Sequence, residues 1–153
     1  MIVLTLPYPV SSNRYWQSFV PAGARRALVH LSTEAKAFKR EVAQIARARG
    51  IAKPLEGRIA VHMRLFPNRP QDWKKRQSKL GAWWDDTVQC IDLGNCEKVT
   101  SDALQGIVYA DDKHIRRLLL ERMEPDEHGA RVIVAIQQLA VPVMQGSLIA
   151  EAA

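Results

Sequence analysis

The segment from Arg58 to Phe66 alternates apolar side chains with polar or small ones, and this period of two is the strongest constraint on the fold. Such alternation is typical of a strand with one buried face. The segment 32–49 instead has apolar residues at helical spacing, which predicts a helix. Ser32 or Thr33 is its expected N-cap, and Gly50 is expected to end it. Both periods in one chain predict an α/β fold with a mixed sheet.

Two further elements are predicted from short signals. The segment Ile2–Leu6 has the composition of a strand, which Pro7 ends because proline cannot donate to a β-ladder. A second helix is predicted from Asn95 to about Gln105, where apolar residues again form a stripe. Asn95 is its natural cap, and Gly106 lies beyond its end.

The last two predicted strands are 115–123 and 131–139. The residues between them have turn composition, so we expect the two strands to form a hairpin. The expected element order is β-loop-α-β-loop-α-β-β. A chain of 153 residues fits one domain, and we assign residues 1–140 to that domain and 141–153 to a C-terminal tail.

The segment from about 67 to 90 has no periodicity and is predicted to be a long exposed loop inserted in the domain. A basic run, Lys74-Lys75-Arg76, is followed in it by Trp83-Trp84. Long loops in compact domains tend to be functional or mobile. Basic residues beside exposed tryptophans suit branched or unstacked DNA.

The overall charge favours a polyanionic partner, because 22 Lys and Arg against 16 Asp and Glu give a formal charge of +6. No run approaches the roughly 20 apolar residues that cross a bilayer, and the N-terminus lacks a targeting pattern. We therefore expect a cytoplasmic protein with no membrane role. Cys90 and Cys96 are expected to be reduced thiols, because they have no partners at zinc-site spacing.

Two other segments are candidates for DNA contacts. The loop 11–16 combines hydrogen-bond donors with aromatic rings, a mixture that holds phosphates and stacks on bases, although a surface loop with a docked tryptophan explains it equally well. The outer face of the helix 32–49 is basic, which fits either a phosphate backbone or simple solvation. The predicted DNA-binding residues are Asn13, Arg14, Tyr15, Arg25, Arg26, Lys36, Lys39, Arg40, Lys74 and Lys75.

Acidic residues gather at both ends of the second helix. Asp92 precedes its N-terminus, and the Asp111-Asp112 pair follows its C-terminus. Crowded carboxylates are unfavourable unless a cation or a basic side chain offsets their repulsion. Mg²⁺ is the obvious cation, since it takes one or two carboxylates and completes its shell with water and phosphate. Such a site fits phosphodiester hydrolysis.

Lys98 lies one helical turn before Asp102. Its ammonium group could orient a nucleophilic water or stabilise charge on a phosphate. Alternatively, it could form an i, i+4 salt bridge with Asp102, and the residues alone favour this second interpretation.

The acidic segment resembles the signature of the RusA family of Holliday junction resolvases, which runs Asp-x-Asp-Asn-x-x-Lys, then Asp-Ala-Leu, then Asp-Asp. The early Leu6-Pro7 and Ser12-Asn13-Arg14-Tyr15 also resemble the family's N-terminal loop. The similarity runs from about Met1 to Leu139 and is interrupted by the longer Pro70–Gln89 loop. The matching positions are Asp92, Asn95, Lys98, Asp102, Ala103, Leu104, Gly106, Asp111 and Asp112.

This resemblance implies a homodimeric nuclease of the kind common in phages and prophages. It would place paired nicks across four-way-junction or other branched DNA during recombination and repair, using Mg²⁺ or, in its place, Mn²⁺. Asp92 and Asp112, with the adjacent Asp111, would be catalytic metal ligands. Lys98 would be a catalytic helper, and Asn95 would support the site.

The sequence departs from the family at Gly94, where the signature has its second carboxylate. We rank first the hypothesis that a nearby acid compensates. Alternatively, one metal ion suffices, or the protein is a catalytically impaired module that still binds junction DNA. The candidate compensating acids are Asp111, Glu97, Asp85 and Asp86.

A third function is also consistent with these acids, that of a small metal-dependent phosphoesterase acting on nucleotides. A homodimer is expected on physical grounds as well, because two coordinated cuts on a nearly two-fold substrate need two active sites. The first strand and the apolar segment 141–149 are the candidate interfaces.

Overall fold

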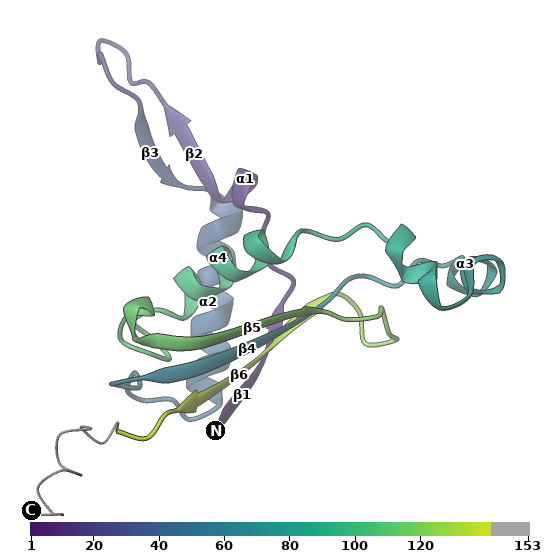
Figure 1. The fold of residues 1–153 in the computed structure, drawn as a ribbon. Helices are drawn as coiled ribbons and strands as arrows, with labels where there is room; N and C mark the ends of the chain where they lie inside the picture. Colours follow the sequence, from purple (N-terminus) through teal and green to yellow (C-terminus); the bar gives the residue numbers. More distant parts are fainter. Residues whose placement is uncertain (142–153) are drawn as a thin grey trace, which may run out of the picture.

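The computed structural model describes residues 1–141. They form a mixed four-stranded sheet with helices packed on one face, and a hairpin and a helical arm project from this body (Figure 1). In chain order the elements are β1 (Ile2–Pro7), α1 (Ser12–Tyr15), β2 (Trp16–Phe19), β3 (Leu28–Leu31), α2 (Thr33–Ala48), β4 (Ile59–Phe66), α3 (Trp73–Leu80), the 3₁₀ helix η1 (Gly81–Thr87), α4 (Leu93–Leu104), the 3₁₀ helix η2 (Asp112–His114), β5 (Ile115–Arg122) and β6 (Arg131–Gln138).

The sheet has the strand order β1-β6-β4-β5. Strand β6 is antiparallel to both of its neighbours, whereas β4 and β5 are parallel. The alternating residues of β4 are buried at every second position, as predicted, and Val61 lies opposite Ile136 of β6. Helices α2 and α4 pack against this buried side, so the hydrophobic core lies between the helices and the sheet.

Helix α2 confirms both of its predicted end signals. The hydroxyl of Ser32 accepts a hydrogen bond from the Ala35 amide at 3.1 Å, so Ser32 rather than Thr33 is the N-cap. Arg49 is the C-cap, and Gly50 follows with a φ of 82°. Glycine adopts this left-handed conformation without steric cost, which explains its place at the helix end.

Helix α4 begins two residues earlier than the sequence predicts, and its N-cap is Asp92, not Asn95. The Asp92 carboxylate accepts a hydrogen bond from the Asn95 amide at 2.7 Å, which satisfies a donor that the helix leaves free. At the other end, Gly106 has a φ of 75° and donates to the carbonyl of Tyr109 at 2.8 Å. This turn returns the chain towards η2.

The predicted hairpin of the last two strands is wrong, because β4 lies between β5 and β6. The intervening residues do turn the chain, and Asp126 accepts from both the His128 amide and the Arg131 guanidinium. However, the two strands that the turn connects each pair with β4 instead of with each other. Strand pairing is decided across the sheet, not by the turn.

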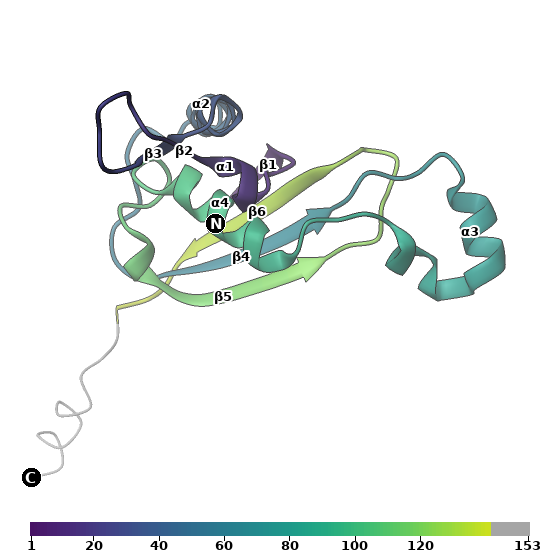
Figure 2. The ribbon, with the colours of Figure 1, turned by 90° about the horizontal axis from the view of Figure 1, so that it is seen from above.

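The predicted long loop is largely helical, because α3 and η1 fill most of the segment 67–90 and pack against each other. Together they form an arm that extends from one end of the sheet (Figures 1 and 2). Only one of its paired tryptophans is exposed: Trp83 is 75% exposed and Trp84 is 1% exposed.

A hairpin formed by β2 and β3 was not predicted, and it projects from the body beside α1 (Figure 1). Arg25 and Arg26 lie in the connection between its strands. All four residues of β2 are exposed, so the segment has no one-sided apolar pattern that would reveal a strand.

Two smaller predictions can be compared with the structure. Cys90 and Cys96 are free thiols, and Cys96 is buried. Within residues 1–141 no helix is both long and apolar enough to cross a membrane. The predicted tail lies outside the described residues apart from Val141.

Candidate functional site

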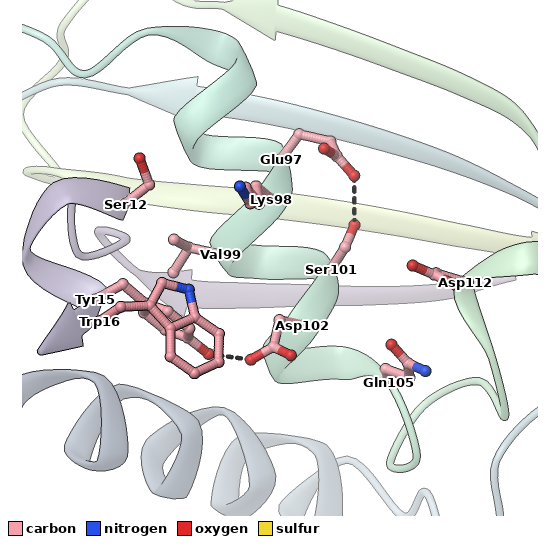
Figure 3. Close-up of a pocket in the computed structure, with 10 residues that line it drawn as sticks. All are labelled: Ser12, Tyr15, Trp16, Glu97, Lys98, Val99, Ser101, Asp102, Gln105 and Asp112. Carbon is pink, nitrogen blue, oxygen red and sulfur yellow. Dashed lines mark hydrogen bonds between the residues drawn. The ribbon is translucent and has the colours of Figure 1, made fainter. Parts of the chain in front are cut away.

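A cavity opens beside α4, bounded by α1 on one side and by η2 on the other (Figure 3). It collects polar side chains from segments that are far apart in the sequence, and two of its acids belong to the predicted signature. The residues that line it are Ser12, Tyr15, Trp16, Glu97, Lys98, Val99, Ser101, Asp102, Gln105 and Asp112.

Asp92 lies at the N-terminus of α4, outside the residues that line the cavity, and is held by a chain of hydrogen bonds. Its carboxylate accepts from both the backbone and the side-chain amide of Asn95. The side-chain oxygen of Asn95 in turn accepts from the hydroxyl of Ser12, which does line the cavity. The structure thus gives Asn95 the contacts of a residue that orients Asp92.

Glu97 and Asp112 both line the cavity, and Figure 3 shows them on the same side of α4. The Ser101 hydroxyl donates to the Glu97 carboxylate at 2.9 Å and fixes its direction. Both acids also act on the buried ring of Tyr109. Burial is the main cause that raises the pKa of Tyr109 to about 12, and the charges of Glu97 and Asp112 add to it.

The predicted salt bridge between Lys98 and Asp102 is not formed. The Asp102 carboxylate pairs instead with Lys39 of α2 at 3.0 Å and accepts a hydrogen bond from the Tyr15 hydroxyl. Lys98 lines the cavity and has no ion-pair partner within residues 1–141. Its ammonium group is therefore available to a ligand of the cavity.

Tyr15 is 2% exposed, so its ring packs in the core and has no free face for a base. Tyr15 therefore has a structural role in this fold, and its predicted contact with DNA stays a prediction. Burial, followed by the hydrogen bond to Asp102, raises the pKa of Tyr15 well above its ordinary value. Trp16 beside it is 48% exposed and lines the cavity.

Asp111 has a different environment from Asp112. Its carboxylate accepts from the Lys113 amide and pairs with the Lys113 ammonium group, both at 3.0 Å. These contacts, the backbone hydrogen bond above all, lower the pKa of Asp111. Asp111 does not line the cavity, and its role as a metal ligand stays a prediction.

Gly94 lies in the first turn of α4, two residues after the N-cap Asp92. A Cβ atom at this position would meet only the Asp92 carboxylate, at 3.4 Å, which is an ordinary contact. Position 94 therefore has room for a side chain that would lie against Asp92.

The acids fit a divalent cation only in part. Among residues 1–141, no three or more His, Cys, Asp or Glu side chains are grouped so that they could hold a metal ion. Glu97 and Asp112 nevertheless offer hard oxygen donors at one cavity. That donor chemistry fits Mg²⁺, which commonly takes only one or two carboxylates.

The other predicted DNA-binding residues are distributed over separate parts of the surface. Asn13 is exposed, and Arg14 pairs with Glu34. Arg25 and Arg26 lie at the end of the hairpin. Of the predicted residues on the helices, Lys36 and Arg40 of α2 and Lys74 and Lys75 of α3 are exposed, whereas Lys39 of α2 is half-buried and pairs with Asp102.

Sequence reasoning missed several polar residues that line the cavity. Ser101 and Gln105 follow Glu97 at helical intervals of four and eight, so the helical period could have placed them on the same face. Ser12 belongs to the segment that resembles the family's N-terminal loop, but its contact with Asn95 could not be predicted, because it joins segments 83 residues apart.

Residues 7–137 match the model of a protein family described as endodeoxyribonuclease RusA. The chain is 34% identical over 98 residues to the crossover junction endodeoxyribonuclease RusA of Enterobacteria phage 82, with 58% of this chain and 76% of the relative covered. Relatives of the same name from Escherichia coli K12 and Shigella sonnei are 33% and 32% identical over 98 residues, again covering 58% of this chain and 76% of the relative.

Proposed function

Because the chain belongs to the RusA family of endodeoxyribonucleases, we propose that it cuts branched DNA, and four-way junctions in particular, by phosphodiester hydrolysis. The observation that carries this proposal is the cavity beside α4, which Lys98, Glu97 and Asp112 line together and where Lys98 has no ion-pair partner among residues 1–141. Hydrolysis of a phosphodiester needs groups of both kinds. The carboxylates can bind a metal ion, and the lysine ammonium group can offset negative charge on the phosphate. The names of the relatives support the junction as substrate.

The proposed reaction depends on Mg²⁺, with Mn²⁺ as a substitute. Glu97 and Asp112, the two acids that share the cavity, are the residues that would hold the ion. Asp92 lies outside the cavity lining, and its role as a ligand stays a prediction from the family signature. When bound, such an ion lowers the pKa of a water molecule and neutralises charge on phosphate oxygens.

The remaining side chains have positioning and charge roles in this proposal. The Lys98 ammonium group stabilises negative charge on the scissile phosphate. Asn95 orients the Asp92 carboxylate, and Ser101 orients that of Glu97.

The direct test is cleavage of a synthetic four-way junction by the purified protein with Mg²⁺ and with Mn²⁺. We expect paired nicks from the wild type and none from Asp112→Asn or Lys98→Met. Asp112→Asn should keep or increase junction affinity, because it removes a repulsive charge near phosphate. Lys53→Met, in the exposed connection between α2 and β4, is the control for Lys98→Met and should cut normally.

Two outcomes of this assay would contradict the proposed nuclease activity. If the protein bound the junction but did not cut it with either metal ion, the alternative of a catalytically impaired DNA-binding module would remain. Hydrolysis of nucleotides in place of junctions would favour the small phosphoesterase.

Glu97 is the acid that the structure favours as the replacement for the carboxylate missing at Gly94. It lines the cavity with Asp112 and lies one helical turn after position 94. Asp85 and Asp86, the other candidates in the arm, belong to η1 and do not line this cavity.

A pair of substitutions separates these candidates. Glu97→Gln should abolish cutting, and Gly94→Asp in the same chain should restore part of it, because position 94 has room for a carboxylate beside Asp92. Binding of Mn²⁺ to the protein, followed by its electron paramagnetic resonance signal, should fall and recover in parallel. If Glu97→Gln cuts normally and Asp85→Asn with Asp86→Asn does not, the arm acids compensate instead.

The proposal includes a homodimer acting in the cytoplasm on phage or host DNA during recombination and repair. Strand β1 supports it as an interface, since β1 is at the edge of the sheet and has one unpaired side. Sedimentation equilibrium should give twice the chain mass of 17.2 kDa. A monomer that still makes paired nicks would contradict this part of the proposal.

A further inference from the structure

The arm formed by α3 and η1 is firmly attached to the body of the protein. Trp84 is buried, and its indole N–H donates to the Glu124 carboxylate at 2.8 Å. The Arg122 guanidinium, at the end of β5, donates to the carbonyls of Asp85 and Val88, at 2.9 Å each. These bonds fix η1 to the end of the sheet, so the arm presents a defined surface (Figures 1 and 2).

Trp83 is held pointing away from that attachment. A 3₁₀ helix has three residues per turn, so consecutive side chains point about 120° apart. With Trp84 turned inwards against Trp73, Trp83 is turned outwards and is 75% exposed. An exposed indole on a fixed support is a flat apolar surface ready for a partner.

The charges on the arm show what kind of partner suits this surface. Lys74, Lys75 and Lys79 of α3 are exposed and have no ion-pair partner within residues 1–141. Arg76 of α3, in contrast, forms an ion pair with Asp72, the residue before the helix, at 2.9 Å. Lysine is depleted at protein–protein interfaces, whereas lysines and exposed aromatic rings on one surface are typical of single-stranded nucleic-acid binding. The Lys74 ammonium group lies 5.7 Å from the ring centre of Trp73, next to the exposed surface of α3. The arm therefore suits DNA better than protein.

We propose that Trp83 stacks on an unpaired DNA base while the lysines of α3 contact the neighbouring phosphates. This inference rests on the proposed action on branched DNA and adds a second, separate contact to it. Bases inside a duplex are already stacked on each other, so only unpaired nucleotides offer a free face. The arm would thus favour branched DNA that exposes unpaired bases, such as a flap or a fork, over fully paired arms.

The test compares three DNAs by fluorescence anisotropy in EDTA, so that no cleavage occurs: a fork with a single-stranded flap, an isolated single strand, and a duplex. Trp83→Ala should weaken binding to the fork and the single strand by about 5- to 150-fold, the range for loss of one stacked base, and leave the duplex within about twofold. Trp83→Phe should keep part of the preference. The control Leu119→Ala removes a side chain that is 52% exposed on β5, and it should change none of the three affinities.

The lysines give an independent readout. Changing Lys74, Lys75 and Lys79 together to Gln should weaken binding to all three DNAs and reduce the salt dependence of binding. Quenching of tryptophan fluorescence by the single strand should be smaller in Trp83→Phe than in the wild type, which reports stacking directly.

Two results would overturn the proposal. One is an unchanged affinity of Trp83→Ala for the fork and the single strand. The other is a change in sedimentation mass without a change in DNA affinity, which would make the arm a contact between copies of the chain. Neither depends on the nuclease activity, because junction cutting by the wild type with Mg²⁺ is measured separately and tests the proposed function alone.

Discussion

Lys98 keeps its ammonium group free because a different lysine neutralises the carboxylate next to it. Asp102 is one turn further along α4, but its carboxylate is paired with Lys39 and hydrogen-bonded by Tyr15. If Lys98 were paired with Asp102 instead, the Lys98–Asp102 ion pair would have to break before Lys98 could contact a phosphate. The contact between α2 and α4 therefore prepares the cavity for an anionic ligand.

All three tyrosines of the chain, Tyr8, Tyr15 and Tyr109, are kept protonated chiefly by burial. Burial is the largest cause that raises the pKa of Tyr8 and of Tyr109 to about 12, from an ordinary 10.0. When the pKa of a tyrosine is higher in the folded than in the unfolded protein, the protonated phenol stabilises the fold. This stabilisation is complete at pH values below the pKa of the unfolded state, and it is lost as the pH rises through the pKa of the folded state.

We therefore expect the free energy of unfolding to fall as the pH rises from about 10 towards 12. Phenolate absorbance should show no tyrosine ionising near its ordinary pKa while the protein is folded. A folded protein in which one tyrosine titrates at that pH would contradict the burial of its hydroxyl.

At the residue scale the sequence predicted the order of the acids along the chain better than their contacts. Asp92 does precede α4, and Asp112 follows it in η2, but only Asp112 lines the cavity. The partner of Asp102 could not be predicted, because Lys39 is 63 residues away and the i, i+4 rule considers only one helix. Contacts of this kind depend on how the helices pack.

At the scale of single elements, the N-cap of α4 has a structural role in this fold and a chemical role in the proposed reaction. Aspartate and asparagine cap helices about equally well, so composition could not choose between Asp92 and Asn95. In the structure Asp92 is the cap and also the carboxylate that the family signature requires. The two roles can be separated by substitution.

Asp92→Ala should lower the free energy of unfolding by about 1 kcal/mol, because the Asn95 amide loses its acceptor. Asp92→Asn keeps an oxygen acceptor and should cost only a few tenths of a kcal/mol. Both substitutions should abolish junction cutting. Urea denaturation and the cleavage assay measure the two effects, and equal destabilisation by Asn and Ala would show that charge, not the hydrogen bond, stabilises the helix end.

Long periodic elements were predictable, and short or nonlocal ones were not. Strand β4 buries every expected position, and helix α2 buries Ala35, Phe38 and Val42 and partly buries Ile45, because one face of each element packs on the core. The β2–β3 hairpin has no buried face on β2, and the strands β5 and β6 find their partner in β4 across the sheet. Local patterns contain no information on either feature.

At the scale of the whole molecule, the basic residues predicted to contact DNA lie in three separate elements. These elements are the connection of the β2–β3 hairpin, α2, and the arm, whose positions Figure 1 shows. The net charge of +6 predicted a polyanionic partner, but only the fold shows that these cations are divided between two projections and the body. Such a distribution fits a substrate with several arms better than a small phosphorylated molecule.

Salt dependence of binding tests this distribution. Each phosphate of a duplex whose charge is neutralised by a Lys or Arg contact contributes about −0.9 to the slope of log affinity against log salt concentration. Replacing Lys36 and Arg40 of α2 by Gln, or Arg25 and Arg26 of the hairpin by Gln, should each flatten the slope for a four-way junction by up to about 1.8. Lys53→Gln should leave the slope unchanged. Because a nucleotide binds through one site, a wild-type slope near zero would contradict several-armed DNA binding and favour the phosphoesterase instead.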